Sequence, residues 1–156
     1  MPPHCQFSLV GGQHFRTRAI GFLFDIEQRE LDAKDVYDTL PLAKEQIVNA
    51  RFKHWLDRAV FDKYFHGFTG KYDRCFVFKW ELRHIPQRLY GFLCHPRPDT
   101  MPFFELCVLM YFATKGEDTN PTILDRINRL RQDPAVREAI AGTYPEFSGR
   151  KKPWTN

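Results

Sequence analysis

The sequence predicts an α+β fold in a single domain, residues 1–156, and three observations lead to this prediction. The chain length of 156 residues is typical of one domain. Three segments within residues 75–114 show the two-residue alternation of β-strands, and their short links favour an antiparallel meander. Segments with helical periodicity lie before and after these strands. Helices segregated from antiparallel strands along the chain are typical of α+β proteins, with the helices packed on the sheet.

The first 42 residues form an N-terminal extension. Residues 6–10 and 18–26 each have the pattern of a strand, and two glycines between them indicate a turn. We therefore expect an N-terminal hairpin. A short helix is expected over residues 32–40. It should end before Pro41, because a proline disfavours helical geometry in the residue that precedes it.

A longer helix is expected from about Leu42 to Tyr64, because apolar side chains recur there at spacings of three and four. His66-Gly67 resembles the end of such a helix. Basic side chains follow a neighbouring stripe, which faces either solvent or a phosphate backbone. This stripe consists of Lys44, Arg51, His54 and Arg58.

The predicted meander consists of strands at residues 75–84, 88–95 and 103–114. The third segment is almost continuously apolar, which is typical of a central strand covered on both faces. Strict alternation puts Met110 and Tyr111 on opposite faces of this strand.

Two helices are expected after the meander. Asn120 followed by Pro121 is a helix start, and the same pattern recurs at Asp133-Pro134. Residues 133–156 therefore form a C-terminal helix and a basic tail.

Charge and composition favour some classes of protein function and exclude others. The net charge is +4, and residues 43–95 alone carry ten basic and five acidic side chains. Such an excess is the footprint of a polyanionic partner, although a mixed solvated surface gives the same count. No apolar run approaches the roughly 18 residues of a membrane span, and the N-terminus lacks a signal-peptide pattern. We expect a cytoplasmic protein with no membrane partner.

The four cysteines lie far apart, without a Cys-x-x-Cys pair. A disulfide framework or a zinc site requires denser spacing. We expect no metal and no cofactor.

Part of the chain, residues 43–132, resembles the RelE/HigB-like toxins of bacterial toxin–antitoxin systems, particularly their phage-derived branch. The resemblance is carried by Trp80-Glu81-Leu82-Arg83, Arg88-Leu89-Tyr90-Gly91-Phe92, the apolar strand Val108 to Lys115, and Asn120-Pro121. It implies a compact antiparallel sheet with helices on one side. It also implies a hydrolase that cleaves mRNA on the ribosome, an mRNA interferase, which a cognate antitoxin protein inhibits.

Metal-independent cleavage of RNA needs fixed cations at the phosphate and a positioned acid or base. Arginine suits the first role because its planar fork pairs two phosphate oxygens. Arg83 and Arg88 are close in sequence across a short link, so they converge if they share a sheet face. The catalytic hypothesis assigns the phosphate to Arg83 and Arg88, additional charge to Lys115, and proton transfer to Tyr111 or His84. The RNA-binding hypothesis comprises Arg51, His54, Arg58 and a base-stacking Tyr90.

Each assignment has a structural alternative. The arginines also fit a solvated surface, His84 fits an exposed turn, and Tyr90 and Tyr111 fit the core. Two other functions therefore stay open, a protein-binding module on the same fold and a domain that binds RNA without cutting it. Convergence of the cations in one concavity favours the enzyme, and their scattering, or burial of Tyr111, favours a binding module.

Overall fold

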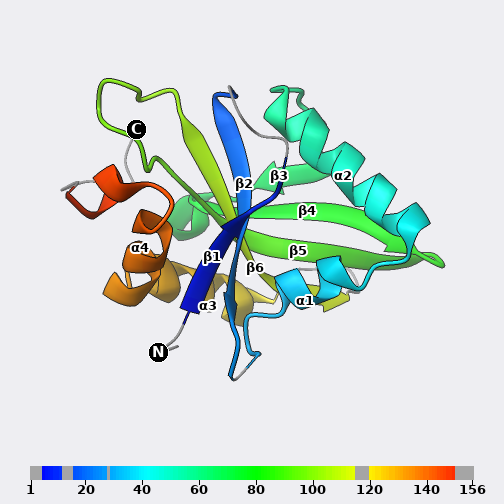
Figure 1. Cartoon of the computed structure of the whole chain (residues 1–156). Helices are drawn as coiled ribbons and strands as arrows, with labels where there is room; N and C mark the ends of the chain where they lie inside the picture. Colours follow the sequence, from blue (N-terminus) through cyan, green and yellow to red (C-terminus); the bar gives the residue numbers. More distant parts are fainter. Residues whose placement is uncertain (1–4, 12–15, 28, 115–119, 150–156) are drawn as a thin grey trace.

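The computed structural model describes residues 5–11, 16–27, 29–114 and 120–149, and a mixed β-sheet forms its centre (Figure 1). Within these residues the sheet has six strands in the order β1-β2-β6-β5-β4-β3. The strands are β1 (Cys5–Leu9), β2 (Arg18–Asp25), β3 (Phe65–Gly67), β4 (Cys75–Leu82), β5 (Ile85–Cys94) and β6 (Glu105–Thr114).

The strand pairing confirms the α+β class, the N-terminal hairpin and the antiparallel meander, but the sheet is not purely antiparallel. β1 pairs with β2, and β4, β5 and β6 pair in sequence, all antiparallel. β2, however, runs parallel to β6. Parallel neighbours need a long crossover connection, and here everything between β2 and β6 forms that connection. The N-terminal extension therefore belongs to the same sheet.

Helices cover both faces of this sheet, whereas the family resemblance implied helices on one side. One face is covered by α1 (Ala33–Asp38) and α2 (Leu42–Leu56), and the other by α3 (Pro121–Arg131) and α4 (Pro134–Ala141), as Figure 1 shows. Two short 3-10 turns are η1 (Gly70–Tyr72) and η2 (Pro145–Gly149). The strands are apolar on both faces, so each face needs its own cover.

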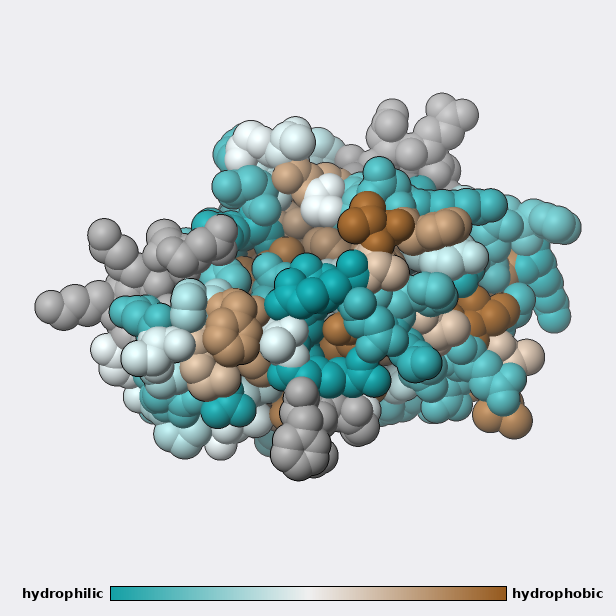
Figure 2. Space-filling view, turned by 90° about the horizontal axis from the view of Figure 1, so that it is seen from above, coloured by the Kyte–Doolittle hydropathy of each residue, from teal (hydrophilic) through white to brown (hydrophobic). Residues whose placement is uncertain are grey.

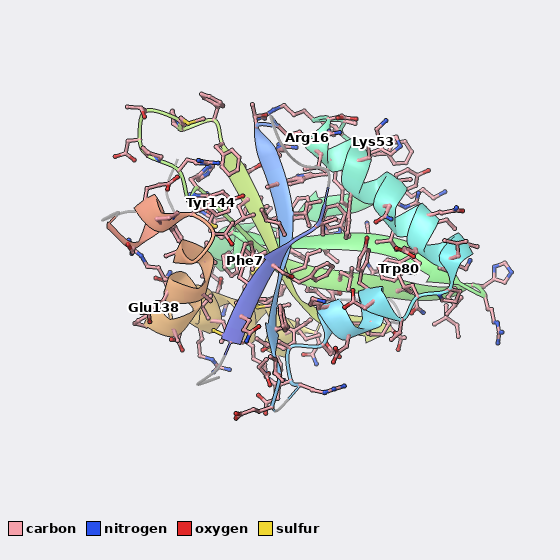
Figure 3. All side chains as sticks on the ribbon, viewed as in Figure 1. Phe7, Arg16, Lys53, Trp80, Glu138 and Tyr144 are labelled. Carbon is pink, nitrogen blue, oxygen red and sulfur yellow. The ribbon has the colours of Figure 1, made fainter. Side chains whose placement is uncertain are left out.

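Two separate apolar cores result. We call the sheet face that carries Ile20, Phe78 and Leu89 the α2 face, since these side chains pack with Phe52 and Trp55 of α2. Trp80 of β4 lies in the same core (Figure 3). On the opposite sheet face, which we call the α3 face, a second core forms between the sheet and the helices α3 and α4. The strands contribute Val77, Tyr90, Val108 and Met110, and the helices contribute Leu124, Ile127 and Ile140.

The helix expected over residues 42–64 ends at Leu56, so that part of the prediction is wrong. Arg58 adopts a left-handed conformation with φ of 63°. The backbone N–H of Arg58 donates to Trp55 O and that of Ala59 to His54 O, which is the Schellman pattern of helix termination. Residues 65–67 then form β3 at the sheet edge, where a helix end was expected.

The turn between β4 and β5 also lies elsewhere than expected. Arg83 and His84 form a two-residue turn with φ of 52° and 67°, the geometry of a type I′ hairpin. The predicted link at residues 85–87 is part of β5. Pro86 is tolerated there because β6 pairs with β5 only from Gln87 onward, so the missing N–H breaks no ladder bond on that side.

The helix starts after the meander are confirmed. The Asn120 side chain accepts a hydrogen bond from Thr122 N at 2.9 Å, and Asp133 accepts one from Ala135 N at 2.8 Å. Proline occupies the first turn in both helices. The predicted basic tail, residues 150–156, lies outside the described residues.

The surface is predominantly polar where Figure 2 shows it. Hydrophilic side chains cover most of that face, and hydrophobic ones appear in small separate areas. Exposed large hydrophobic residues of the described chain include Val60, Phe61 and Phe103.

Candidate phosphate-binding site

A basic cavity of about 580 Å³ lies where α2, the segment before β3 and the β4–β5 hairpin meet. Five basic side chains line it, with Glu81 as the acidic one. The basic residues are Lys44, Arg51, Lys63, Lys79 and Arg88. Within the described part of the chain, none of the five forms an ion pair with a carboxylate. We call this space the basic cavity.

Lys79 and Arg88 lie directly opposite each other on β4 and β5. Like charges in this position destabilise a sheet unless an anion lies between them. Burial lowers the pKa of Lys79, and the nearby Arg88 lowers it further. The Nε of Arg88 is buried and has no hydrogen-bond partner among the described residues. These features leave an unneutralised pair of cations at the cavity.

Arg51 is fixed at the rim of the basic cavity by two contacts. Its Nε donates to Lys79 O at 3.2 Å, and its guanidinium lies 3.4 Å from the ring centroid of Tyr64. β3 is short and pairs with β4 only as far as Phe78, so no β3 residue pairs with Lys79. The backbone N–H of Lys79 donates to the carbonyl oxygen of Tyr64, just before β3, at 2.7 Å. The Nζ of Lys79 donates to Asp62 O at 2.6 Å. Both cations are thus held in place by backbone oxygens.

His66 is a candidate functional residue that sequence reasoning missed. It lies on β3 opposite Val77, so strand alternation puts it on the α3 face with Lys79 and Arg88. Its pKa is lowered by burial, and both cations lower it further. Nδ1 lies 2.7 Å from Gly67 O, which makes Nδ1 the protonated nitrogen in the neutral ring. Nε2 is then the basic atom. A three-residue strand shows too little alternation to be detected in sequence.

The predicted residues divide among several places, and Arg88 and Arg51 are the two in the basic cavity. Arg83 and His84 are exposed at the hairpin tip. Arg88 lies three residues beyond Ile85, which closes the turn, and each strand residue adds roughly 3.3 Å. Arg83 is therefore separated from Arg88 along the hairpin, and it is not among the residues that line the basic cavity.

Tyr111 is half-buried on the α3 face, not on the face that strict alternation gives. Tyr90 pairs with Tyr111 but Gly91 pairs with Leu109, so Met110 is the extra residue of a β-bulge. Met110 and Tyr111 therefore both face α3. Burial raises the pKa of Tyr111. Tyr111 lines a second cavity, separate from the basic cavity. Lys115 lies outside the described residues.

Three of the four residues predicted to bind RNA do not line the basic cavity: Tyr90, Arg58 and His54. Tyr90 is fully buried, so its ring is inaccessible to a base. Arg58 holds the loops together instead, because its guanidinium donates to Thr17 Oγ1 and Phe103 O at 3.0 to 3.1 Å. His54 is exposed on α2 and contacts the Tyr64 ring edge, with centroids 5.8 Å apart.

The described residues contain no group of three or more histidine, cysteine or acidic side chains arranged to hold a metal ion. None of their helices has the length and apolar character needed to cross a bilayer. All four cysteines are free thiols.

No family model, curated protein or solved structure matches this chain. The fold and the site define an α+β protein with a basic cavity at the end of a sheet.

Proposed function

We propose that the protein binds single-stranded RNA at the basic cavity and cleaves it without a metal ion, as an endoribonuclease of the RelE/HigB-like toxin type. The observation that carries this proposal is the opposed pair Lys79 and Arg88, two cations without a carboxylate partner beside a cavity with three further basic side chains. A phosphodiester supplies the missing negative charge. Arginine and lysine contacts to phosphate are the main source of affinity for nucleic acid.

The proposed chemistry assigns one role to each of four side chains. The RNA 2′-oxygen attacks the adjacent phosphorus, the P–O5′ bond breaks, and a 2′,3′-cyclic phosphate and a 5′-hydroxyl form. Arg88 and Lys79 stabilise the extra charge on the phosphoryl oxygens. His66 Nε2 accepts the 2′-hydroxyl proton, since its lowered pKa keeps the ring neutral at neutral pH. Tyr111 retains its proton because its pKa is raised, and donates it to the leaving 5′-oxygen.

The sequence resemblance over residues 43–132 supplies the proposed partners. These are mRNA on the ribosome as substrate and a cognate antitoxin protein as inhibitor. The antiparallel meander that the resemblance implies is present as β4, β5 and β6. The N-terminal strands and the parallel β2–β6 pair are additions to that pattern.

The test is expression of the chain in growing cells, with mapping of mRNA 5′ ends. Cuts inside coding regions are expected with the native sequence and are lost in Arg88→Gln and in Lys79→Gln. Lys53→Gln is the matched control, because Lys53 is an exposed cation of α2 outside the basic cavity (Figure 3). Growth arrest without mRNA cleavage, or cleavage unchanged in both cavity variants, contradicts the proposal.

RNA binding without cleavage is the second candidate function. It is favoured by the separation of the predicted catalytic groups, since Arg83 and His84 lie at the hairpin tip and Tyr111 lines a different cavity from Arg88. In that case an RNA oligonucleotide binds the purified protein and Arg88→Gln weakens the binding, but the oligonucleotide stays intact.

A further inference from the structure

The cations of the basic cavity are spread along it rather than gathered at one point. Lys44 and Arg51 both lie on α2 and line the cavity, seven residues and therefore roughly 10 Å apart along the helix axis. The Nε of Arg51 donates to Lys79 O, so Arg51 belongs to the end of the cavity where Lys79 and Arg88 lie. Lys44 lies toward the other end. The basic cavity therefore has room for more than one phosphate group.

Most hydrogen-bond donors of these cations have no partner within the described part of the chain. The Nζ of Lys79 donates one bond to a backbone oxygen, which leaves two of the three hydrogens of an ammonium group. Arg51 uses only its Nε, so the N–H groups on its two terminal nitrogens have no partner among the described residues. Lys44, Lys63 and Arg88 donate no side-chain hydrogen bond to a described residue. These donors match a ligand with many acceptor oxygens.

The charge of the basic cavity exceeds the charge that an RNA strand brings into it. Five basic side chains and the carboxylate of Glu81 line the cavity, which gives a net charge of +4 in about 580 Å³. RNA has one negative charge per nucleotide, so a strand that crosses this volume neutralises only part of the excess. In a chain of linked phosphates each phosphate carries a negative charge, and a terminal one gains a second charge above about pH 6. Three linked phosphates therefore balance the cavity more closely.

We propose that the basic cavity also binds a chain of three linked phosphates, which competes with RNA. Arg88 and Lys79 hold one phosphate, Lys44 holds the phosphate at the opposite end, and Arg51 donates to the chain between them. Free nucleoside triphosphates and inorganic polyphosphate both contain such a chain. It occupies the position proposed for the scissile phosphate, so it inhibits cleavage. The inhibition rests on the proposed function, whereas the binding of linked phosphates does not.

Calorimetry on the purified full chain, without phosphate buffer or divalent cations, measures the binding of inorganic tripolyphosphate and of orthophosphate. Tripolyphosphate is expected to bind at least about 10-fold more tightly, because it forms charge-assisted hydrogen bonds with at least one more cation. ATP distinguishes the two sources of the chain. Tighter binding of ATP than of tripolyphosphate assigns the site to nucleoside triphosphates, and equal or weaker binding assigns it to inorganic polyphosphate.

Three variants locate the chain within the basic cavity. Lys44→Gln is expected to weaken tripolyphosphate binding at least about 5-fold and to leave orthophosphate binding unchanged, because a single phosphate lies with Lys79 and Arg88. Arg88→Gln is expected to weaken both. Lys53→Gln is the matched control, since it removes an exposed cation of the same helix outside the cavity (Figure 3), and it should change neither affinity. Thermal unfolding without ligand verifies that each variant is folded.

Equal affinity for tripolyphosphate and orthophosphate overturns this inference, and so does unchanged tripolyphosphate affinity in Lys44→Gln. Neither result depends on RNA. Tripolyphosphate binding with the expected variant pattern, in a protein that neither binds nor cleaves RNA, leaves the linked-phosphate site in place and contradicts the proposed function. RNA cleavage that is lost in Arg88→Gln but is not inhibited by tripolyphosphate contradicts the competition and leaves the endoribonuclease in place.

Discussion

Gly91 of β5 lies so close to Val108 of β6 that a Cβ at position 91 would be 1.8 Å from the Val108 carbonyl oxygen. This contact is next to the bulge that turns Tyr111 toward α3. Any side chain at position 91 must push the two central strands apart. Glycine is therefore required for the bulge, and through it for the position of Tyr111.

Gly91→Ala is accordingly expected to lower the free energy of unfolding by at least about 2 kcal/mol, because the clash is with backbone in a packed core. Urea unfolding followed by circular dichroism measures this. The control is Gly11→Ala, since a Cβ there meets nothing within 4 Å. Equal unfolding midpoints for the two variants would show that β5 and β6 tolerate the added carbon.

Arg88→Gln is expected to leave the stability of the free protein within about 1 kcal/mol of the native value, or to raise it, since it removes a like-charge pair with Lys79. A single-stranded RNA oligonucleotide is expected to raise the Tm of the native protein, and to raise that of the variant much less. Thermal unfolding with and without the oligonucleotide measures both effects, with Lys53→Gln as control. A large loss of stability without RNA would mean that Arg88 is structural.

His66 is expected to make stability depend on pH. Its pKa in the folded state is below the ordinary value of 6.5, so the unfolded chain takes up the proton first as the pH falls. The free energy of unfolding therefore decreases from about pH 6.5 down to the folded-state pKa. An anion in the basic cavity offsets the charges of Lys79 and Arg88 and raises the pKa of His66.

NMR titration of the His66 ring, with and without inorganic phosphate, measures that pKa directly. Urea unfolding between pH 5 and 7.5 measures the linked stability, and His66→Gln should remove this part of the pH dependence. A pKa of His66 above 6.5 in the free protein would refute the proposed neutral base.

Replacing the turn Arg83-His84 by Asn-Gly is expected to stabilise the protein by about 1 kcal/mol. Both residues have positive φ, which costs energy for side chains other than glycine and asparagine. Denaturant unfolding measures the gain. The variant should also retain RNA binding and cleavage, because the hairpin tip is distant from Arg88. Loss of cleavage with a gain in stability would restore Arg83 or His84 to the catalytic group.

Asp32 is expected to connect α1 to β6. Its Oδ1 accepts a hydrogen bond from Phe112 N at 2.8 Å, beyond the last pair between β2 and β6. Asp32→Ala leaves that N–H without a partner and should cost about 1–3 kcal/mol. Asp32→Asn keeps an oxygen acceptor and should cost less. The difference between the two variants in urea unfolding measures the bond, and equal losses would assign the effect to packing.

The sequence was sufficient for features that depend on nearby residues. The capping side chains Asn120 and Asp133 predict two helix starts because the cap and the helix are adjacent in the chain. Alternation predicts the meander, and the apolar character of residues 103–114 predicts a central strand, which the structure shows over Glu105–Thr114. The excess of basic residues over positions 43–95 predicts a positive region, and Arg51 and Arg88 lie in it.

Other features had no local signal. The type I′ turn lacks glycine and asparagine, so Pro86 gave the stronger, misleading signal for the turn. The bulge depends on the close approach of Gly91 to Val108, and these two residues are far apart in the sequence. The bulge puts Tyr111 on the opposite sheet face from the one that strict alternation gives. Strict alternation cannot anticipate such a shift.

The sequence by itself thus determined the element types, the helix caps and the sign of the charge, because these depend on composition and on neighbours in the chain. Only the tertiary structure decided that β2 pairs parallel with β6, that Lys79 opposes Arg88, and that Tyr111 faces Arg126 and Arg129. These relationships arise from register and packing between segments distant in sequence, which the local pattern of neither segment specifies.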